Sequence, residues 1–102
     1  MMIAVCRTSD VIPGEGKRIE LPGRKPIALF NVDGSFHAID DTCTHGEASL
    51  CEGFVEGGIV ECPYHAGTFE ICSGKALTFP AVEPVGTYRV AIDGDQVCLI
   101  FD

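Results

Sequence analysis

The sequence predicts an all-β domain, a small antiparallel sandwich or barrel into which a loop-rich lobe is inserted. Twelve glycines and six prolines interrupt the 102-residue chain every few residues. No stretch of about ten residues places its apolar side chains at the spacing of an amphipathic helix. Two Asp-Gly dipeptides separate short apolar runs, a pattern typical of tight β-hairpins. These three observations favour short antiparallel strands over any helical arrangement.

The base of the domain is expected in residues 1–40 and 85–102. The segments "MIAVCRTS" (2–9) and "KRIEL" (17–21) predict one strand each. The segment "PIALFNVDGSFHAID" (26–40) predicts two strands joined by Asp33-Gly34, and "TYRVAIDGDQVCLIF" (87–101) predicts two more joined by Asp93-Gly94. Asp-Gly suits a type I′ turn because both central residues need positive φ.

The inserted lobe is expected in residues 41–84, where glycines, prolines and loops dominate. Two short runs, "GIVEC" (58–62) and "GTFEI" (67–71), predict one strand pair inside it. A chain of this length forms one domain with a modest core, so base and lobe belong to a single folding unit spanning residues 1–102.

The net charge of −8, from 15 acids and 7 bases, argues against nucleic acid and anionic membranes as partners. A basic protein surface is the natural complement. Between Asp40 and Gly74 there are seven acids and no Lys or Arg. This run is either a solvated face or a docking surface. Its members are Asp40, Asp41, Glu47, Glu52, Glu56, Glu61 and Glu70.

The chain is expected to be soluble and cytoplasmic. No apolar run approaches the roughly 18 residues of a membrane span, and the opening "MMIAVCRTSD" lacks the basic and apolar regions of a signal peptide. In a reducing compartment the six cysteines are expected to bind metal or to be buried, not to form a disulfide framework.

Two Cys/His pairs form the candidate metal site. Cys43 and His45 flank one residue, sixteen residues follow, and Cys62 and His65 flank two. A closed Cys2His2 zinc site is one interpretation, although Cys-x-His is tight for a single ion. The other is a two-iron cluster, with both thiolates on one iron and both imidazoles on the other.

The pattern C-x-H-x16-C-x2-H, here "CTH" and "CPYH", resembles the ligand pattern of Rieske [2Fe-2S] proteins. The segment "HAGTFEICSGKALTFPAVEPVGTYRV" resembles their second cluster loop, the following hairpin, the proline loop over the cluster and the return to the base. The resemblance implies a Rieske fold and one [2Fe-2S] cluster per chain. Cys43 and Cys62 would bind one iron, and His45 and His65 the other.

In its small size, with nothing appended to the Rieske pattern, the chain resembles the free-standing Rieske ferredoxins of bacterial aromatic-ring-hydroxylating dioxygenase systems. That resemblance implies a monomeric one-electron carrier between an NAD(P)H-dependent flavoprotein reductase and a terminal oxygenase. It does not imply an enzyme, since only His37 remains for any catalytic iron and no Gly-rich nucleotide loop is present. The alternatives are a subunit of a larger oxidoreductase, such as a nitrite-reductase-type or oxygenase assembly, and a zinc-stabilised interaction domain.

Departures from the respiratory Rieske proteins indicate the reduction potential. Ala48 and Tyr64 occupy the positions of the cysteines that form a disulfide in that branch, and Gly67 and Phe69 replace its Ser and Tyr hydroxyl donors. Each missing hydrogen bond disfavours the reduced, more negative state. We expect a potential of about −150 mV, near the low end of the Rieske range.

The other conspicuous residues are given structural roles. Cys6 and Cys98 are expected to be small core residues. Cys51 and Cys72 are expected either to pack in the lobe or to be exposed without a chemical role. His37 is expected to lie at the surface or to be half-buried. Tyr64 is expected to shield the cluster and is also a docking candidate. Four further residues are interpreted as backbone devices that close loops over the site: Gly46, Gly67, Pro80 and Pro84.

Overall fold

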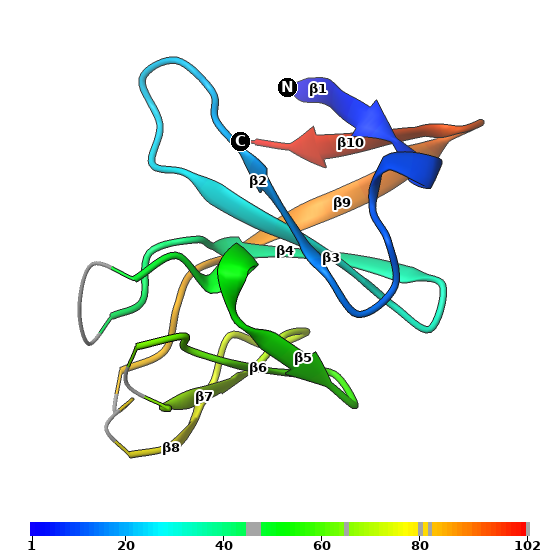
Figure 1. Ribbon diagram of the computed structural model, residues 1–102. Helices are drawn as coiled ribbons and strands as arrows, with labels where there is room; N and C mark the ends of the chain where they lie inside the picture. Colours follow the sequence, from blue (N-terminus) through cyan, green and yellow to red (C-terminus); the bar gives the residue numbers. More distant parts are fainter. Residues whose placement is uncertain (45–47, 65, 80, 82, 102) are drawn as a thin grey trace.

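The computed structural model describes residues 1–44, 48–64, 66–79, 81 and 83–101, and Figure 1 shows their arrangement. These residues form ten strands in two antiparallel sheets, with two short 3-10 helices, η1 (Thr8–Asp10) and η2 (Leu50–Glu52). The described part of the chain contains no α-helix. The all-β fold class is therefore confirmed.

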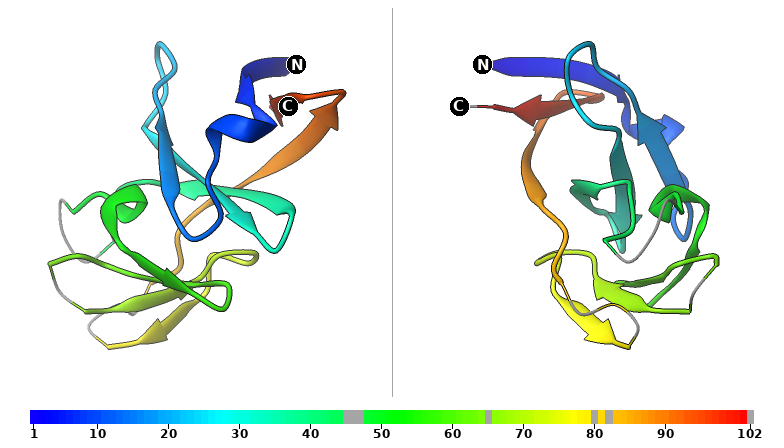
Figure 2. Two further views of the ribbon diagram at one scale, coloured as in Figure 1. Left: turned by 45° about the vertical axis from the view of Figure 1, so that its right-hand side comes forward. Right: turned by 90° about the vertical axis from the view of Figure 1, so that its left-hand side faces the viewer.

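The larger sheet has six strands in the order β1-β10-β9-β4-β3-β2. Its strands are β1 (Met2–Arg7), β2 (Gly16–Ile19), β3 (Ile27–Val32), β4 (Ser35–Asp40), β9 (Thr87–Asp93) and β10 (Gln96–Ile100). The smaller sheet has the order β5-β6-β7-β8. Its strands are β5 (Phe54–Glu56), β6 (Ile59–Glu61), β7 (Thr68–Glu70) and β8 (Ala76–Thr78). The smaller sheet lies at one end of the larger one, in both views of Figure 2.

The two predicted Asp-Gly turns differ in whether the structure places the turn at the predicted residues. In the β3–β4 hairpin Val32 pairs with Ser35, so Asp33 and Gly34 form the turn, with φ of 51° and 87°. Both values are positive, as a type I′ turn requires. In the β9–β10 hairpin Asp93 pairs with Gln96, so Gly94 and Asp95 form the turn instead.

The predicted Asp93-Gly94 turn is therefore wrong by one residue. Asp93 remains in β9, and of the two turn residues Gly94 has the positive φ, at 63°. A glycine at the first central position is the preference of a type II′ turn, the other turn that matches the twist of a hairpin. The dipeptide located the hairpin, but the pairing register decided which residues turn.

The larger sheet curls around one hydrophobic core, which we call the base core. Residues from β2, β3, β4 and β10 contribute to it, although β10 and β3 are not neighbours in the sheet. Their inner faces can share a core only because the twisted sheet curls. The buried members are Val11, Ile19, Ile27, Leu29, Ala38, Val97, Leu99 and Phe101.

A second core, the lobe core, lies between the two sheets. Its buried members are Ala28, Phe30, Ile39, Cys43, Ala48, Leu50, Val60, Cys62, Phe69, Ile71, Ala81 and Val85. Strand β3 contributes to both cores, since Ile27 and Leu29 face one and Ala28 and Phe30 the other. Alternation along a strand produces this division, and all four side chains have 0% exposure.

Candidate metal centre

Two cysteines are buried at the start of two turns of equal length. Cys43 is 2% exposed and its amide donates to the Ala48 carbonyl at 2.9 Å. Cys62 is 1% exposed and its amide donates to the Gly67 carbonyl at 2.8 Å. Each hydrogen bond reaches five residues ahead, so the two loops, residues 43–48 and 62–67, are closed in the same way. Both cysteines belong to the lobe core.

A third segment approaches both loops. The Thr44 hydroxyl donates to the Glu83 carbonyl at 2.8 Å, which joins the first loop to the segment before β9. A side chain at Gly67 would lie 2.9 Å from the Cβ and backbone nitrogen of Ala81, so only glycine permits the second loop to come this close. Gly67 was expected as such a device, whereas no pattern in the sequence indicated a role for Thr44.

Half of the predicted ligand set lies outside the described residues. The structure brings Cys43 and Cys62 into one core, but His45 and His65 are not among the residues that it describes. Gly46 and Pro80 also lie outside. Among the described residues, no three His, Cys, Asp or Glu side chains form a metal-binding group, as expected when half of a four-ligand set is not included.

The donor chemistry of the described half suits an iron-sulfur cluster. Two thiols sit in a shared apolar core at the start of two short loops of matching closure. Buried thiolates between backbone turns are the usual ligands of such clusters. The described residues therefore fit the cofactor that the sequence pattern implies.

Comparison with known proteins decides the family. Residues 1–89 match the Rieske [2Fe-2S] domain. The chain belongs to the Rieske [2Fe-2S] family. It is 47% identical over 96 residues to the 3-phenylpropionate/cinnamic acid dioxygenase ferredoxin subunit of Escherichia coli (strain K12), covering 93% of this chain and 89% of that protein.

Solved structures agree with this assignment. The Sphingomonas yanoikuyae B1 ferredoxin superposes with a TM-score of 0.95 at 36% identity, with all of both chains covered. A chain in the complex of reduced oxygenase and oxidised ferredoxin in carbazole 1,9a-dioxygenase gives 0.91 at 39% identity, covering 96% of this chain and 91% of that one. This Rieske protein is thus a ferredoxin of the aromatic dioxygenase type, an electron carrier with a [2Fe-2S] cofactor and not an enzyme.

Two of the seven acids expected on a charged face accept hydrogen bonds within the ferredoxin, and one of the two is buried. Asp41 is 1% exposed. Asp40 accepts from the Tyr88 hydroxyl at 2.5 Å and from the Gly86 amide at 2.9 Å. The prediction of a solvated or docking face is therefore wrong for Asp41, whereas Asp40 is half-buried and keeps part of its surface exposed. Strand alternation was the available signal, because adjacent residues at a strand end point to opposite faces.

The remaining cysteines follow the structural interpretation. Cys98 is 2% exposed and Cys6 packs half-buried against the base core. Cys51 is half-buried beside Ser49, and burial raises the pKa of its thiol. Cys72 is exposed near Glu70, whose pKa is lowered mainly by the hydrogen bond from Ser73.

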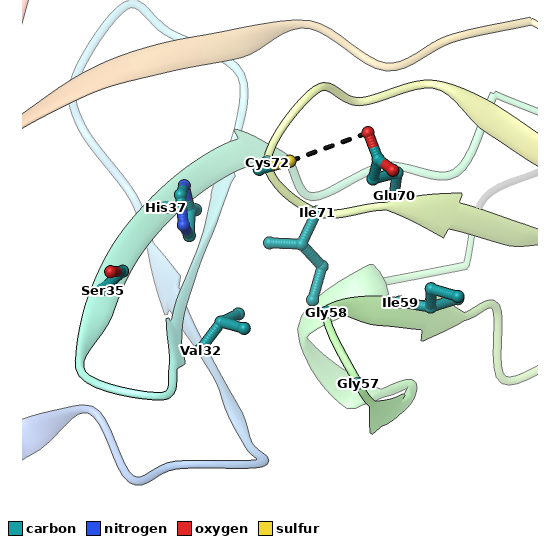
Figure 3. A pocket seen from close by; sticks show the side chains of 9 residues that line it. All are labelled: Val32, Ser35, His37, Gly57, Gly58, Ile59, Glu70, Ile71 and Cys72. Carbon is teal, nitrogen blue, oxygen red and sulfur yellow. Dashed lines mark hydrogen bonds between the residues drawn. The ribbon is translucent and has the colours of Figure 1, made fainter.

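His37 is half-buried, as expected, and lines a cavity of about 390 Å³ at the junction of base and lobe. Figure 3 shows its side chain on β4, with Cys72 and Glu70 across the cavity. Gly57 and Gly58 form another wall. Among the described residues, the cavity is lined by neither of the buried ligand candidates, Cys43 and Cys62.

Proposed function

We propose that this Rieske ferredoxin receives single electrons from an NAD(P)H-oxidising flavoprotein reductase and delivers them to the terminal oxygenase of an aromatic-ring dioxygenase system. The observation that carries the proposal is the pair of buried cysteines, in matched loops, within a chain that resembles dioxygenase ferredoxins over nearly its full length. One structural relative is a ferredoxin in complex with an oxygenase, which supports an oxygenase as one partner.

Four residues are proposed as ligands. Cys43 and Cys62 would bind one iron through sulfur, and His45 and His65 the other through a ring nitrogen. When bound, the cluster supplies reversible one-electron chemistry. The burial of both cysteines supports a sulfur side turned away from water, which leaves the imidazole side as the exit for electrons.

The two sheets support a division of the chain into a base and a lobe. We propose a single domain over residues 1–102, with a base of residues 1–40 and 85–102 and a lobe of residues 41–84. The long strands of the larger sheet support the base as a platform. The smaller sheet, formed entirely by residues 54–78, supports the lobe as the unit that carries both loops.

The surface beside the two loops has an apolar centre and acidic surroundings. Tyr64 in the second loop is 75% exposed, and Phe79 before the third segment is 81% exposed. Tyr64 is thus better suited to contact a partner than to shield the cluster. Glu83, whose carbonyl accepts from Thr44 in the first loop, is exposed, and Glu61 directly precedes Cys62 at the start of the second loop. A partner with an apolar patch inside a basic rim would complement this surface, through a small interface that can dissociate.

The ferredoxin is proposed to act as a monomer in the cytoplasm. The described part of the chain has no helix that could span a membrane. The four cysteines outside the ligand pattern are free thiols, which suits a reducing compartment: Cys6, Cys51, Cys72 and Cys98. Gel filtration of the isolated protein should give a single species of monomer mass, whereas an obligate subunit of a larger oxidoreductase should associate or aggregate.

Electron paramagnetic resonance of the dithionite-reduced protein tests the ligand set, because the average g-value separates mixed His/Cys ligation from all-Cys ligation. His45→Cys should either abolish the cluster or make its potential more negative. An unchanged spectrum and potential in that variant would remove His45 from the ligand set. A colourless preparation with one zinc and no labile sulfide would instead support the zinc-domain alternative.

The kinetics of reduction test the docking proposal. Raising the salt concentration should slow reduction by a flavoprotein reductase, because salt screens attraction between the acidic lobe and a basic partner. A rate constant that does not change with salt would show that the acids do not steer docking. The midpoint potential is expected near −150 mV, and a positive value would contradict the reasoning from the missing donors.

A further inference from the structure

The two cysteine loops stand on different stems. The second loop connects β6 and β7, which are paired at three positions, Ile59 with Glu70, Val60 with Phe69 and Glu61 with Thr68. The first loop rises from one isolated bridge, Thr42 with Ser49, outside any strand. Because a short hairpin is barely stable by itself, the first loop needs another restraint.

The carboxylate of Asp41 supplies that restraint. Its Oδ2 accepts a hydrogen bond from the Ser49 hydroxyl at 2.6 Å, and its Oδ1 accepts one from the Cys51 amide at 3.0 Å. The Asp41 carbonyl also accepts from the Leu50 amide at 2.6 Å. These three bonds tie the residue that enters the loop to the three residues that leave it. Cys51 lies in η2, so the carboxylate also caps an amide of this short helix.

Burial makes this arrangement strong. Asp41 is 1% exposed, and a carboxylate in such a place is stable only when hydrogen-bonded. Hydrogen bonds to a charged acceptor are about twice as strong as neutral ones. Arg18 on β2 adds a longer ion pair, with Nη1 at 3.8 Å from Oδ2, and this contact connects the stem to the base.

We propose that Asp41 is a positioning residue for the iron-sulfur site, replacing the strand ladder that the first loop lacks. It keeps Cys43, two residues further on, in the buried position that it shares with Cys62. Its negative charge, fixed at the foot of the loop, opposes the arrival of an electron and so lowers the reduction potential. The inference rests on the proposed ligand role of Cys43.

Two variants separate the hydrogen bond from the charge. Asp41→Asn removes the charge but keeps an oxygen for the Cys51 amide, while Ser49→Ala removes one donor and keeps the charge. The lobe offers a matched control pair, because the Ser73 hydroxyl donates to Glu70 at the same distance, 2.6 Å, in an exposed turn. Glu70→Gln and Ser73→Ala therefore make the same chemical changes without touching either cysteine loop.

The experiment measures release of iron to a chelator, the reduced-state paramagnetic resonance spectrum, the midpoint potential and hydrogen exchange of the Cys51 amide in the holoprotein. Asp41→Asn and Ser49→Ala should each release iron roughly tenfold faster than wild type. The Cys51 amide should exchange faster in both. Only Asp41→Asn should shift the potential to a clearly more positive value than Glu70→Gln does.

Wild-type iron release, spectrum and Cys51 exchange in both variants would overturn the inference. So would an equal effect of Glu70→Gln and Ser73→Ala. If Asp41→Asn does not fold, Ser49→Ala decides by its iron release and amide exchange. A wild-type protein that binds no cluster would refute the proposed function instead, and Cys51 exchange in the two variants would still test whether Asp41 holds the loop.

Discussion

The base core and the lobe core differ in the length of the strands that cover them and in whether they contain cysteines of the candidate metal centre. The base core lies inside a sheet whose strands have four to seven residues. The lobe core is covered by strands of three residues each, and two of its buried members are the proposed ligands Cys43 and Cys62. We therefore expect the base to be stable as a polypeptide alone, and the lobe core to depend on the cofactor that Cys43 and Cys62 are proposed to bind.

Loss of the cluster should have the largest effect, and it should be confined to the lobe. In Cys62→Ser we expect no cluster, because one thiolate ligand is missing, and since metal binding is coupled to local folding the lobe should open. Amide exchange should become fast at Val60 and Phe69 and stay slow at Leu29 and Leu99. Equal loss of protection in both regions would show that base and lobe unfold as one unit.

A pair of substitutions on β3 tests the same difference by packing. Phe30 faces the lobe core and Leu29 the base core, and both have 0% exposure. Phe30→Ala should cost about 3–5 kcal/mol of unfolding free energy and Leu29→Ala about 2–5 kcal/mol. Only Phe30→Ala should also accelerate iron release. Equally fast release in Leu29→Ala would mean that the two cores are not separate.

A hydrogen bond within the base, between β9 and the end of β4, gives a smaller, pH-dependent effect. Tyr88 donates to Asp40, and burial together with that carboxylate raises the pKa of Tyr88 to about 12 from an ordinary 10. The folded state therefore holds this proton more tightly than the unfolded state, so stability is complete below pH 10 and declines between pH 10 and 12. Tyr88→Phe should cost about 1 kcal/mol at neutral pH and flatten this decline. Denaturant unfolding at several pH values measures both the loss of stability at neutral pH and the decline at high pH. If the decline is unaltered in Tyr88→Phe, another titrating group causes it.

The smallest effect concerns two residues with positive φ, one in each region. Ala66 has φ of 58° in the second cysteine loop, and Asp33 has 51° in the β3–β4 turn. A left-handed backbone conformation costs alanine about 1–2 kcal/mol. Glycine avoids this strain, but it also raises the conformational entropy of the unfolded chain, which offsets part of the gain in stability. Ala66→Gly should therefore stabilise the protein by about 0.5 kcal/mol, while Asp33→Gly should be neutral because aspartate tolerates this region. Destabilisation by Ala66→Gly would show that the Ala66 methyl group contributes packing.

Local chemistry explains which parts of the fold could be predicted. The β3–β4 hairpin was predicted with its turn because two positive φ values suit Asp-Gly, and β6 and β7 were predicted as a pair. Strand β5 was missed because its three residues are too few to show a periodicity, and its place in the sheet comes from pairing with β6. The Gly94-Asp95 turn required a register that only the pairing of β9 with β10 defines.

The candidate site divides in the same way. Ligand spacing is local, so Cys43 and Cys62 could be named from the sequence. The residues that hold the loops act through contacts between distant segments, as Thr44 does with Glu83 and Asp41 with Arg18. A count of acids could not separate the buried Asp41 from exposed Glu52, because burial is decided by the packing of η2 against the stem of the first loop.

The ends of the chain lie together. The Met1 ammonium donates to the Phe101 carbonyl, and Figures 1 and 2 show both ends on the larger sheet, on the far side of the molecule from the two cysteine loops. A linker or tag attached at either end would leave the two cysteine loops, where we propose that electrons are exchanged, uncovered. The two ends could also be joined to each other and the chain reopened in an exposed turn such as Asp33-Gly34. The same geometry suits fusion of this carrier to a redox partner, in which the tether would replace diffusion by a high local concentration.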